Sequence, residues 1–305
     1  MTLPGAGDGP IRTGPERRTA VVTGAARGVG AALARRLAAR GTAVALVGLE
    51  PDELSATAEA CRRHSPARSW VADVTDLSRM QAVAAEVVAE FGRIDIVVAN
   101  AGIAIGGPVA DSDPETFARV IEVNLLGSVA TARAFLPALV NSRGYLLQMA
   151  SLAAVAPGPL MAAYAASKAG VEAFAQALGA EVAHRGVTVG VAYLSWTDTD
   201  MVRGADEDEP LRRMRSRLPW AANTTAPLAP AVERLLTGID RRSLRVYGQS
   251  WIRPLLWLPR AALPALVARV APRDMARLDD LLHATAGQRR LPMGPGGRAG
   301  ASPRS

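Results

Sequence analysis

The sequence predicts an α/β protein with a Rossmann-like, doubly wound parallel sheet, in a single domain with a C-terminal helical extension. Two observations predict this fold. Short runs of β-branched and other apolar residues alternate with helical stretches from about residue 19, and strands buried on both faces of a parallel sheet show this pattern. A glycine-rich loop also joins the first apolar run to the first helical stretch, which is typical of folds that bind dinucleotides.

The individual elements follow from these runs. Strands are predicted at 20–23, 43–47, 69–72, 94–99, 145–149, 188–193 and 244–247. Helices are predicted near 29–39, 52–63, 77–91, 114–139, 161–184 and 229–238. We expect a disordered N-terminal lead over 1–17, the sheet domain over 18–250, an apolar and basic helical extension over 251–286, and a disordered tail over 287–305.

Composition limits the class of protein. The hydrophobic fraction of 49% in 305 residues is enough for a sizeable core, which excludes wholesale disorder. The one cysteine, Cys61, cannot form an intrachain disulfide, and the histidines show no ligand spacing, so we expect no metal site. The start lacks a secretory apolar region, and arginines interrupt the apolar stretch 254–272. We therefore expect a cytoplasmic protein without a membrane span.

The positive charge is unevenly distributed. Residues 241–305 contain 12 Arg and 3 Asp, a net charge of +9, so the total of +7 leaves −2 for residues 1–240. Of the 35 basic residues, one is a lysine, Lys168, and the other 34 are arginines. A coding bias toward arginine explains the 34 but not the exception, so Lys168 is the first candidate for a specific role.

The glycine loop 23–30 predicts a phosphate site. Its glycines follow the spacing G-x-x-x-G-x-G, which lets the backbone turn tightly and approach a pyrophosphate at the helix N-terminus. The alternative is a plain turn from strand to helix. The cofactor-binding candidates in this loop are Gly24, Ala26, Arg27, Gly28, Val29 and Gly30.

The end of the second strand bears on the choice of cofactor. An acidic residue usually stands there and binds the adenosine ribose 2′-hydroxyl. Here positions 48 and 49 are Gly and Leu, so that acid is missing unless Glu50 swings back. Arg27 could face a 2′-phosphate instead, although it could equally be a solvated loop arginine. The sequence favours NADP(H), with NAD(H) as the alternative.

Tyr164 and Lys168 form the strongest catalytic candidate. They are four residues apart in a predicted helix and therefore share one face. An ammonium group beside a phenol favours the phenolate and lowers its pKa from about 10, and the planar fork of arginine is a poor substitute. Ser151 follows the strand 145–149, at the sheet edge where ligands of such folds bind. Its hydroxyl could hold a carbonyl oxygen, or it could simply form a turn.

With these residues in place, the chain resembles the short-chain dehydrogenase/reductase family over about residues 18–250. The resemblance rests on the glycine loop, Asp73 in A-D-V-T-D, Asn100-Ala101-Gly102, Asn124, Ser151 and Tyr164-x-x-x-Lys168, in this order. It implies that Tyr164 moves the proton, Ser151 orients the substrate oxygen, and Lys168 binds the nicotinamide ribose and tunes Tyr164. Asn124 would hold a water linking Lys168 to solvent.

The resemblance also assigns cofactor contacts. Asp73, with its neighbour Val74, would lie at the adenine, while Asn100, Ala101 and Gly102 would form the cofactor floor. One departure stands out: where the family usually has Pro-Gly after the strand 188–193, this chain has Leu194-Ser195. Thr199 still matches the position that holds the nicotinamide carboxamide.

The remaining segments bear on substrate and partners. Met201, Met214, Leu218 and Trp220 either line an apolar pocket or simply pack. Segment 251–286 mixes tryptophans and aliphatic residues with arginines, which suits peripheral contact with anionic lipid at the inner membrane surface. Its four prolines favour short, broken helices over one long helix. The alternative is that this segment packs on its own domain or covers the substrate cleft.

We therefore expect an NAD(P)(H)-dependent oxidoreductase that interconverts an alcohol and a carbonyl on a hydrophobic, lipid-, steroid- or terpenoid-like substrate, and that forms a homo-oligomer. Nucleic acid is not an expected partner, because basic and apolar residues alternate and no recognition motif is present. The rival hypothesis is a non-catalytic dinucleotide-binding or membrane-associated sensor on the same fold. The close Tyr-x-x-x-Lys spacing disfavours an enoyl reductase or epimerase.

Overall fold

The computed structural model describes residues 17–285 and 291–301, and it contains the predicted doubly wound sheet. Within these residues, parallel strands form one sheet in the order β3-β2-β1-β4-β5-β6-β7. The strands are β1 (Thr19–Thr23), β2 (Ala43–Gly48), β3 (Ala67–Val71), β4 (Ile96–Ala99), β5 (Tyr145–Met149), β6 (Thr188–Tyr193) and β7 (Arg245–Tyr247). Chain order reverses between β1 and β4, which creates the crevice where ligands of such sheets bind.

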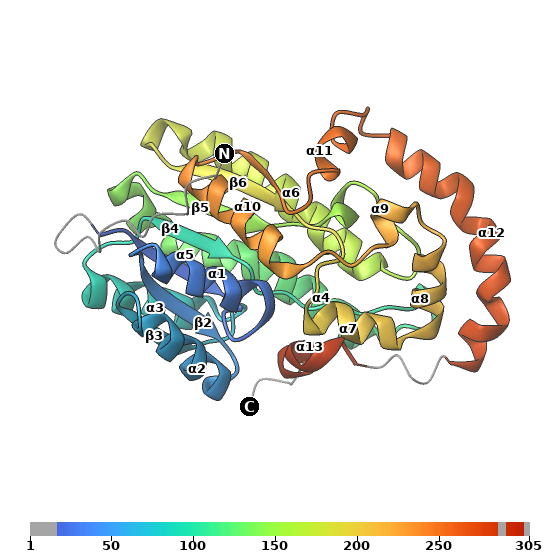
Figure 1. The fold of residues 1–305 in the computed structure, drawn as a ribbon, viewed down its shortest axis with the longest axis horizontal. Helices are drawn as coiled ribbons and strands as arrows, with labels where there is room; N and C mark the ends of the chain where they lie inside the picture. The colour runs from blue at the N-terminus through green and yellow to red at the C-terminus, as the bar shows by residue number, and fades with distance from the viewer. Residues whose placement is uncertain (1–16, 286–290, 302–305) are drawn as a thin grey trace, which may run out of the picture.

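Helices cover both faces of the sheet (Figure 1). One face carries α1 (Gly28–Ala39), α2 (Pro51–Arg62) and α10 (Leu228–Asp240), and the other carries α3 (Leu77–Phe91), α5 (Gly127–Ser142) and α6 (Ala162–Val182). Side chains of β1 alternate between the two cores: Ala20 and Val22 pack with α1 and α10, while Val21 packs with α3 and α5. The predicted continuous apolar runs are therefore explained by burial on both sides.

The predicted helix at 114–139 is interrupted. It consists of α4 (Pro114–Ile121), a π-helical turn (Glu122–Leu126) and then α5. This run, Pro114–Ser142, is long and apolar enough to cross a membrane, unlike the segment 254–272 that the sequence singled out; 56% of its most apolar window is buried in the fold. Core helices of compact proteins meet the same criterion, and this run packs against β4, β5 and α3.

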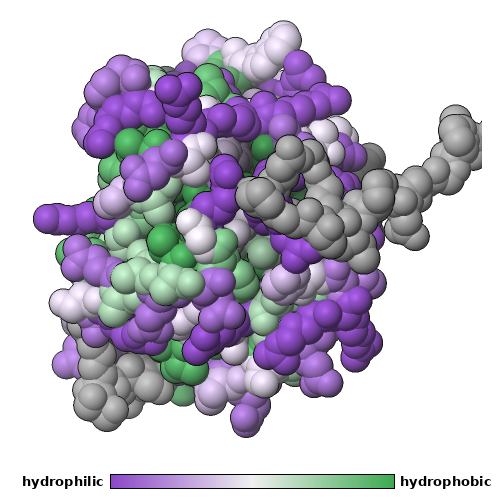
Figure 2. Space-filling model, turned by 90° about the vertical axis from the view of Figure 1, so that its left-hand side faces the viewer, coloured by the Kyte–Doolittle hydropathy of each residue, from purple (hydrophilic) through white to green (hydrophobic). Residues whose placement is uncertain are grey.

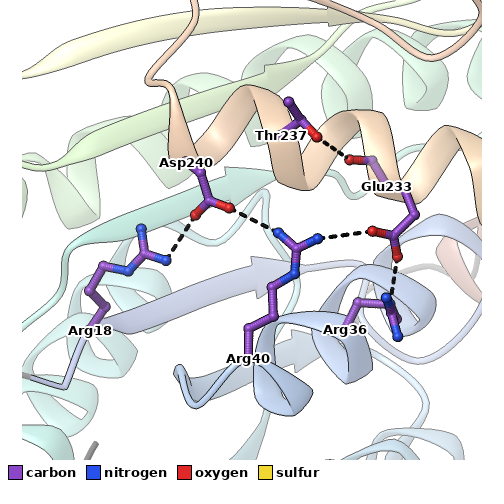
Figure 3. Close-up of polar contacts among 6 residues, drawn as sticks. All are labelled: Arg18, Arg36, Arg40, Glu233, Thr237 and Asp240. Carbon is purple, nitrogen blue, oxygen red and sulfur yellow. Dashed lines mark hydrogen bonds and ion pairs between the residues drawn. The ribbon is translucent and has the colours of Figure 1, made fainter. Parts of the chain in front are cut away.

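On the surface, ion pairs connect the start of the sheet domain to α10, near its end in the sequence. Arg18 and Arg40 both contact Asp240, at 2.9 Å each, and Arg40 also contacts Glu233 at 2.9 Å. Arg36 adds a 2.6 Å contact to the same glutamate (Figure 3). This exposed network joins β1 and α1 to α10, although exposed ion pairs stabilise a fold by only about 0.2–1 kcal/mol each.

The surface is mixed in character. On the side of the molecule drawn in Figure 2, hydrophilic residues surround a band of apolar ones. Exposed apolar side chains of the described residues include Val71, Val88 and Leu126. Scattered apolar groups are ordinary on globular surfaces and need no partner to explain them.

The segments outside the sheet form helices around one end of the domain. They are α7 (Asp200–Glu207), α8 (Glu209–Ser216), α9 (Trp220–Asn223), α11 (Ile252–Leu255), α12 (Ala262–Ala284) and α13 (Gly294–Ala301). Short 3₁₀ turns occupy Val109–Asp111, Leu152–Ala154 and Ala183–Arg185. In Figure 1, α12 runs along the edge of the molecule farthest from β3, and α13 returns beneath α7.

Two expectations about the C-terminus need correction. The segment 251–286 is not a series of short, broken helices, because α12 continues for 23 residues. Pro264 lies in its first turn, where the backbone N–H has no helical partner, and Pro272 is accommodated within it. The predicted disordered tail contains α13, which tertiary contacts with α7 hold in place. Residues 1–16, 286–290 and 302–305 lie outside the described residues.

Candidate active site

One cavity of about 690 Å³ brings the predicted site residues together at the carboxyl edge of the sheet. Its lining contains every predicted catalytic and cofactor-binding residue except Ala26, Gly30 and Asn124. Those that line it are Gly24, Arg27, Gly28, Val29, Asp73, Val74, Asn100, Ala101, Gly102, Ser151, Tyr164, Lys168 and Thr199. Of the three exceptions, Gly30 packs against Gly24 and Asn100, and Asn124 lies against Gly102.

The glycine loop has the geometry of a phosphate cradle. Gly24 has φ +63°, and a Cβ there would lie 2.8 Å from the Cα of Ala101. At Gly30 a Cβ would lie 2.2 Å from the Gly24 carbonyl oxygen, so this glycine serves close packing within the loop. No side chain caps the N-terminus of α1, which leaves its first N–H groups free to bind an anion. The residues present therefore fit the pyrophosphate of a dinucleotide.

Asn100 ties this loop to the end of β4. Its side-chain Nδ2 donates to the carbonyl oxygens of Thr23 at 2.9 Å and Gly24 at 3.2 Å. The Thr23 hydroxyl in turn accepts from the backbone N–H groups of Asn100 and Ala101. Thr23, which the sequence did not single out, thus aligns the floor of the cavity with its phosphate cradle.

Asp73 is held in its charged form. Its carboxylate accepts from the backbone and hydroxyl of Thr75, and from Arg119 Nη2 at 2.6 Å. Burial by itself raises the pKa of Asp73, but the hydrogen bonds from Thr75 and Arg119 outweigh it and the pKa lies below its usual value. Arg119 carried no recognisable signal in the sequence, because it is one arginine among 34.

Asn124 lies on the π-helical turn and is fully buried. Its Oδ1 accepts from the N–H of Ile103 at 2.8 Å, and its Nδ2 donates to the carbonyl of Ile103 and to the Ser167 hydroxyl, both at 2.9 Å. The Ser167 hydroxyl donates onward to the backbone carbonyl of Tyr164. Because both donors of the amide are used in these bonds, Asn124 positions the segment after β4 relative to the catalytic helix.

Ser151, Tyr164 and Lys168 meet in the middle of the cavity. The Ser151 hydroxyl lies between the Leu194 carbonyl, 3.3 Å away, and the N–H of Ala153, 3.2 Å away. Lys168 is buried, and its Nζ donates to the carbonyl of Met149 at 2.8 Å. Nζ also lies 5.7 Å from the centre of the Tyr164 ring. The helical spacing therefore places the pair on one face, as predicted.

Burial dominates the titration of this pair. Loss of hydration raises the pKa of Tyr164, and a hydrogen bond with Ser151 only partly offsets it. Burial also lowers the pKa of Lys168 from 10.5 to about 8. The net rise in the pKa of Tyr164 comes from its burial. The Lys168 ammonium is hydrogen-bonded to Met149 here and not to the phenol, so the predicted lowering of the Tyr164 pKa by Lys168 stays a prediction.

Arg27 does not stand free at the phosphate loop. Its Nη2 lies 2.5 Å from Glu50 Oε1 and 2.9 Å from Glu53 Oε1, and its Nη1 lies 3.5 Å from Asp200 Oδ2. Glu50 also lines the cavity. Glu50, the N-cap residue of α2, thus supplies the acidic group near the end of β2. Three carboxylates, from Glu50, Glu53 and Asp200, surround the Arg27 guanidinium.

The turn that replaces Pro-Gly is built from other contacts. The side chain of Gln249 accepts from the N–H of Ser195 at 2.9 Å and donates to the Thr197 hydroxyl at 3.0 Å. The buried Arg215 stacks on the Trp196 ring, 4.6 Å from its centre, and bonds to Asp206 at 2.6 Å. These contacts fix the segment that leads to Thr199 and α7, which sequence reasoning left uncertain.

The C-terminal helices form walls of the same cavity. Leu266, Val267 and Val270 of α12 line its apolar end together with the predicted Met201, Met214 and Leu218. Across this end, Arg217 Nη1 lies 2.7 Å from Asp274 Oδ1. Residues of α13 line the end that holds Arg27 and Asp73. The side chain of Trp220 is not among those described.

Comparison with known proteins identifies the family. Residues 18–210 match the short chain dehydrogenase family model. The chain is 35% identical over 195 residues to 3-oxoacyl-[acyl-carrier-protein] reductase FabG of Escherichia coli strain K12, an alignment that covers 64% of this chain and 79% of that one. It is 38% identical over 195 residues to 1-deoxy-11-beta-hydroxypentalenate dehydrogenase of Streptomyces exfoliatus, covering 62% and 70% of the two chains.

A solved structure agrees with this result. A short chain dehydrogenase from Mycobacterium paratuberculosis bound to NAD superimposes with a TM-score of 0.67 at 29% identity, covering 75% of this chain and 95% of that one. The chain therefore belongs to the short-chain dehydrogenase family. It is an alcohol/carbonyl oxidoreductase that uses a nicotinamide dinucleotide.

The lowered pKa of Lys168 makes stability depend on pH in a defined direction. Between about 8 and 10.5 the unfolded chain binds this proton while the folded chain has lost it, so the contribution of Lys168 to stability rises with pH in that window. We expect the free energy of unfolding of the wild type to rise, relative to Lys168→Met, by about 2 kcal/mol between about pH 7 and pH 10. Urea titrations of both proteins measure this difference, and parallel pH curves would contradict it.

Proposed function

We propose that this protein interconverts a hydrophobic alcohol and its carbonyl counterpart, with NAD(H) as the preferred cofactor. The observation that carries the proposal is the continuity of the cavity: Ser151, Tyr164 and Lys168 open directly into an apolar mouth. That mouth is lined by Met161, Met201, Met214, Leu218, Leu266 and Val267. A lipid-, steroid- or terpenoid-like substrate suits such a lining, because burying apolar surface is what favours its binding.

The residues of the chain have separate roles in this reaction. A bound nicotinamide supplies or accepts the hydride. The Ser151 hydroxyl orients the substrate oxygen, and Tyr164 Oη gives or takes its proton as general acid–base. Lys168 binds the ribose diol and, once its ammonium turns from the Met149 carbonyl toward the phenol, favours the phenolate. Asn124 keeps the catalytic helix and the segment after β4 in register.

Removing the Tyr164 hydroxyl tests the mechanism. We expect Tyr164→Phe to lower kcat by at least about a hundredfold, because general acid–base catalysis contributes that much or more, while dinucleotide binding changes little. The measurement is turnover of a panel of hydrophobic and small polar alcohols and ketones, paired with NADH titration by fluorescence. Turnover confined to small polar compounds would contradict the substrate class.

The same variant decides between the enzyme and the binding protein. Unchanged activity of Tyr164→Phe would refute the proton-transfer role. A wild-type protein that binds dinucleotide but turns over nothing in the panel would favour the non-catalytic sensor. A complete set of Tyr, Lys, Ser and Asn argues against that sensor, since binding alone does not need a group for proton transfer.

The carboxylates around Arg27 support NAD(H) over the NADP(H) that the sequence favoured. Arg27 of the phosphate loop is already paired with Glu50, which follows β2, and with Glu53. With Asp200 also near, the cluster carries a net negative charge, which disfavours a 2′-phosphate. Glu50 lines the cavity and can accept a hydrogen bond from a ribose hydroxyl instead.

Neutralising Glu50 tests this preference. We expect Glu50→Gln to lower the KM for NADPH by about tenfold, equivalent to about 1.4 kcal/mol, and to raise the KM for NADH. Glu53→Gln is the matched control, because Glu53 also pairs with Arg27 but does not line the cavity. Steady-state kinetics with both cofactors measure the change. A wild type that already prefers NADPH would overturn the assignment.

We also propose peripheral contact with anionic membranes through α12 and the segment before it. Trp251, Ile252 and Leu256 pack on the sheet domain, which restricts any contact surface to the exposed side chains. Among these, Trp257 is 75% exposed and Leu266 58%. Leu266 also lines the cavity mouth, so an apolar substrate could enter from the lipid surface. Neighbouring arginines complement anionic headgroups.

Vesicle binding tests this contact. The protein is sedimented with vesicles of phosphatidylglycerol and phosphatidylcholine in equal parts, and with phosphatidylcholine alone. We expect binding to the anionic vesicles and at least a fivefold loss in Trp257→Ser, because an apolar anchor is removed. Leu244→Ser is the control, since Leu244 is also exposed but lies just before β7, outside this segment. Equal losses in both variants, or no binding by the wild type, would contradict the proposal.

The predicted homo-oligomer stays a prediction.

A further inference from the structure

The C-terminal helix α13 lies at the dinucleotide end of the cavity, well beyond the residues that carry the family motifs. Gly296, Gly297, Ala299 and Gly300 line the cavity together with the phosphate loop and Asp73. Met293, just before the helix, also lines it and packs in the apolar cluster with Met161 and Met214. The family match ends at residue 210, so these residues are an addition to the family domain. They reach the site through contacts with the segment after β4, with α7, with the phosphate loop and with α4.

The first contacts join the start of α13 to the segment after β4 and to α7. The N–H of Met293 donates to the carbonyl of Ala104 at 2.8 Å, and the Met293 side chain is buried against Ala104 and Leu160. A Cβ on Gly204 of α7 would lie 2.6 Å from the backbone nitrogen of Gly294. The backbones of α7 and α13 are therefore in contact. Helix α7 begins at the residue that follows Thr199.

The second set of contacts reaches the residues that surround the adenosine end. A Cβ on Gly296 would lie 3.2 Å from Cδ of Arg27, and one on Gly300 would lie 2.9 Å from the side chain of Ile103. The carbonyl of Gly300 accepts from Arg119 Nε at 2.8 Å. The same guanidinium binds Asp73 at 2.6 Å. One arginine thus bridges α13 to the aspartate at the predicted adenine site.

The sequence of α13 shows that these contacts hold it in place. Its eight residues are Gly-Pro-Gly-Gly-Arg-Ala-Gly-Ala, and four glycines and a proline make an isolated helix of this length unstable in water. Its order therefore depends on the surfaces against which it packs, and a ligand that adds to those surfaces stabilises it.

We propose that α13 is a clasp for the cofactor: it forms the outer wall of the adenosine and pyrophosphate end of the dinucleotide site and opens for the cofactor to exchange. Bound dinucleotide fills the space between α13, the phosphate loop and Asp73, and thereby orders the helix. Because α13 also touches α7, closure over the cofactor also steadies the segment that carries Thr199. The inference rests on dinucleotide binding by the chain and not on the choice of substrate.

Hydrogen exchange of the wild-type protein tests the clasp directly. The exchange of the amides in 291–301 is followed with and without saturating NADH. The clasp predicts slower exchange of this segment by at least tenfold on binding. Faster exchange would mean that α13 occupies the place of the cofactor and must be expelled, and unchanged exchange would mean that it is a bystander. Either result overturns the proposal.

A pair of variants tests the kinetic consequence. Gly300→Val places a side chain against Ile103 and should displace α13, so we expect the NADH dissociation rate in stopped flow to rise at least tenfold. ADP, which carries the adenosine and pyrophosphate, should lose affinity in parallel. Arg298→Val on the exposed side of the same helix is the control, with expected rates equal to those of the wild type.

The outcomes are distinguishable from failure of the proposed function. NADH binding without turnover would refute the enzyme activity and leave this test intact. Unchanged dissociation in a folded Gly300→Val protein, checked by circular dichroism, would overturn the clasp even if turnover is normal. If that variant does not fold, the exchange measurement on the wild type decides alone.

Discussion

The hydrogen bonds of one buried amide, Asn124, join the elements that carry the candidate catalytic residues. Oδ1 and Nδ2 pair with both backbone groups of Ile103, and Nδ2 also reaches Ser167 on the catalytic helix. The side chain can face both partners because it lies on a π-helical turn, which shifts the helix register by one residue. An unsatisfied buried amide costs about 1–3 kcal/mol, so the turn, the segment after β4 and the catalytic helix are constrained as one unit.

The sequence predicted the sheet, and it predicted that the candidate site residues gather at one edge of it, for a physical reason. Strands buried on both faces leave an unmistakable apolar run, and strand ends such as Ser151 and Asn100 fall at one edge of a parallel sheet whatever the details of packing. What the sequence could not show was which distant side chain each arginine meets. Arg27 meets Glu50, Arg119 meets Asp73 and Arg215 meets Trp196, and in a chain with 34 arginines no single one stands out.

The C-terminal region was predicted less well because its helices are determined by tertiary contact. Composition alone places α13 among disordered tails, and the prolines argue against the length of α12. Both helices owe their order to surfaces elsewhere: Leu278 and Leu282 are buried against α8, and Met293 against the segment after β4. The basic tail is therefore an addition that walls the cavity at both ends, and its charge says little about the chemistry inside.

The buried position of Lys168 explains why this residue is a lysine and not an arginine. Lys168 is 4% exposed, and its burial brings the pKa of the ammonium to about 8. An arginine keeps its charge when buried, carries five donors in a rigid fork and would leave several of them unsatisfied here. An ammonium needs few partners, and its single bond to Met149 can be exchanged for one to a ribose or a phenol. A coding bias that favours arginine elsewhere thus meets a site where only the smaller, titratable cation fits both the space and the chemistry.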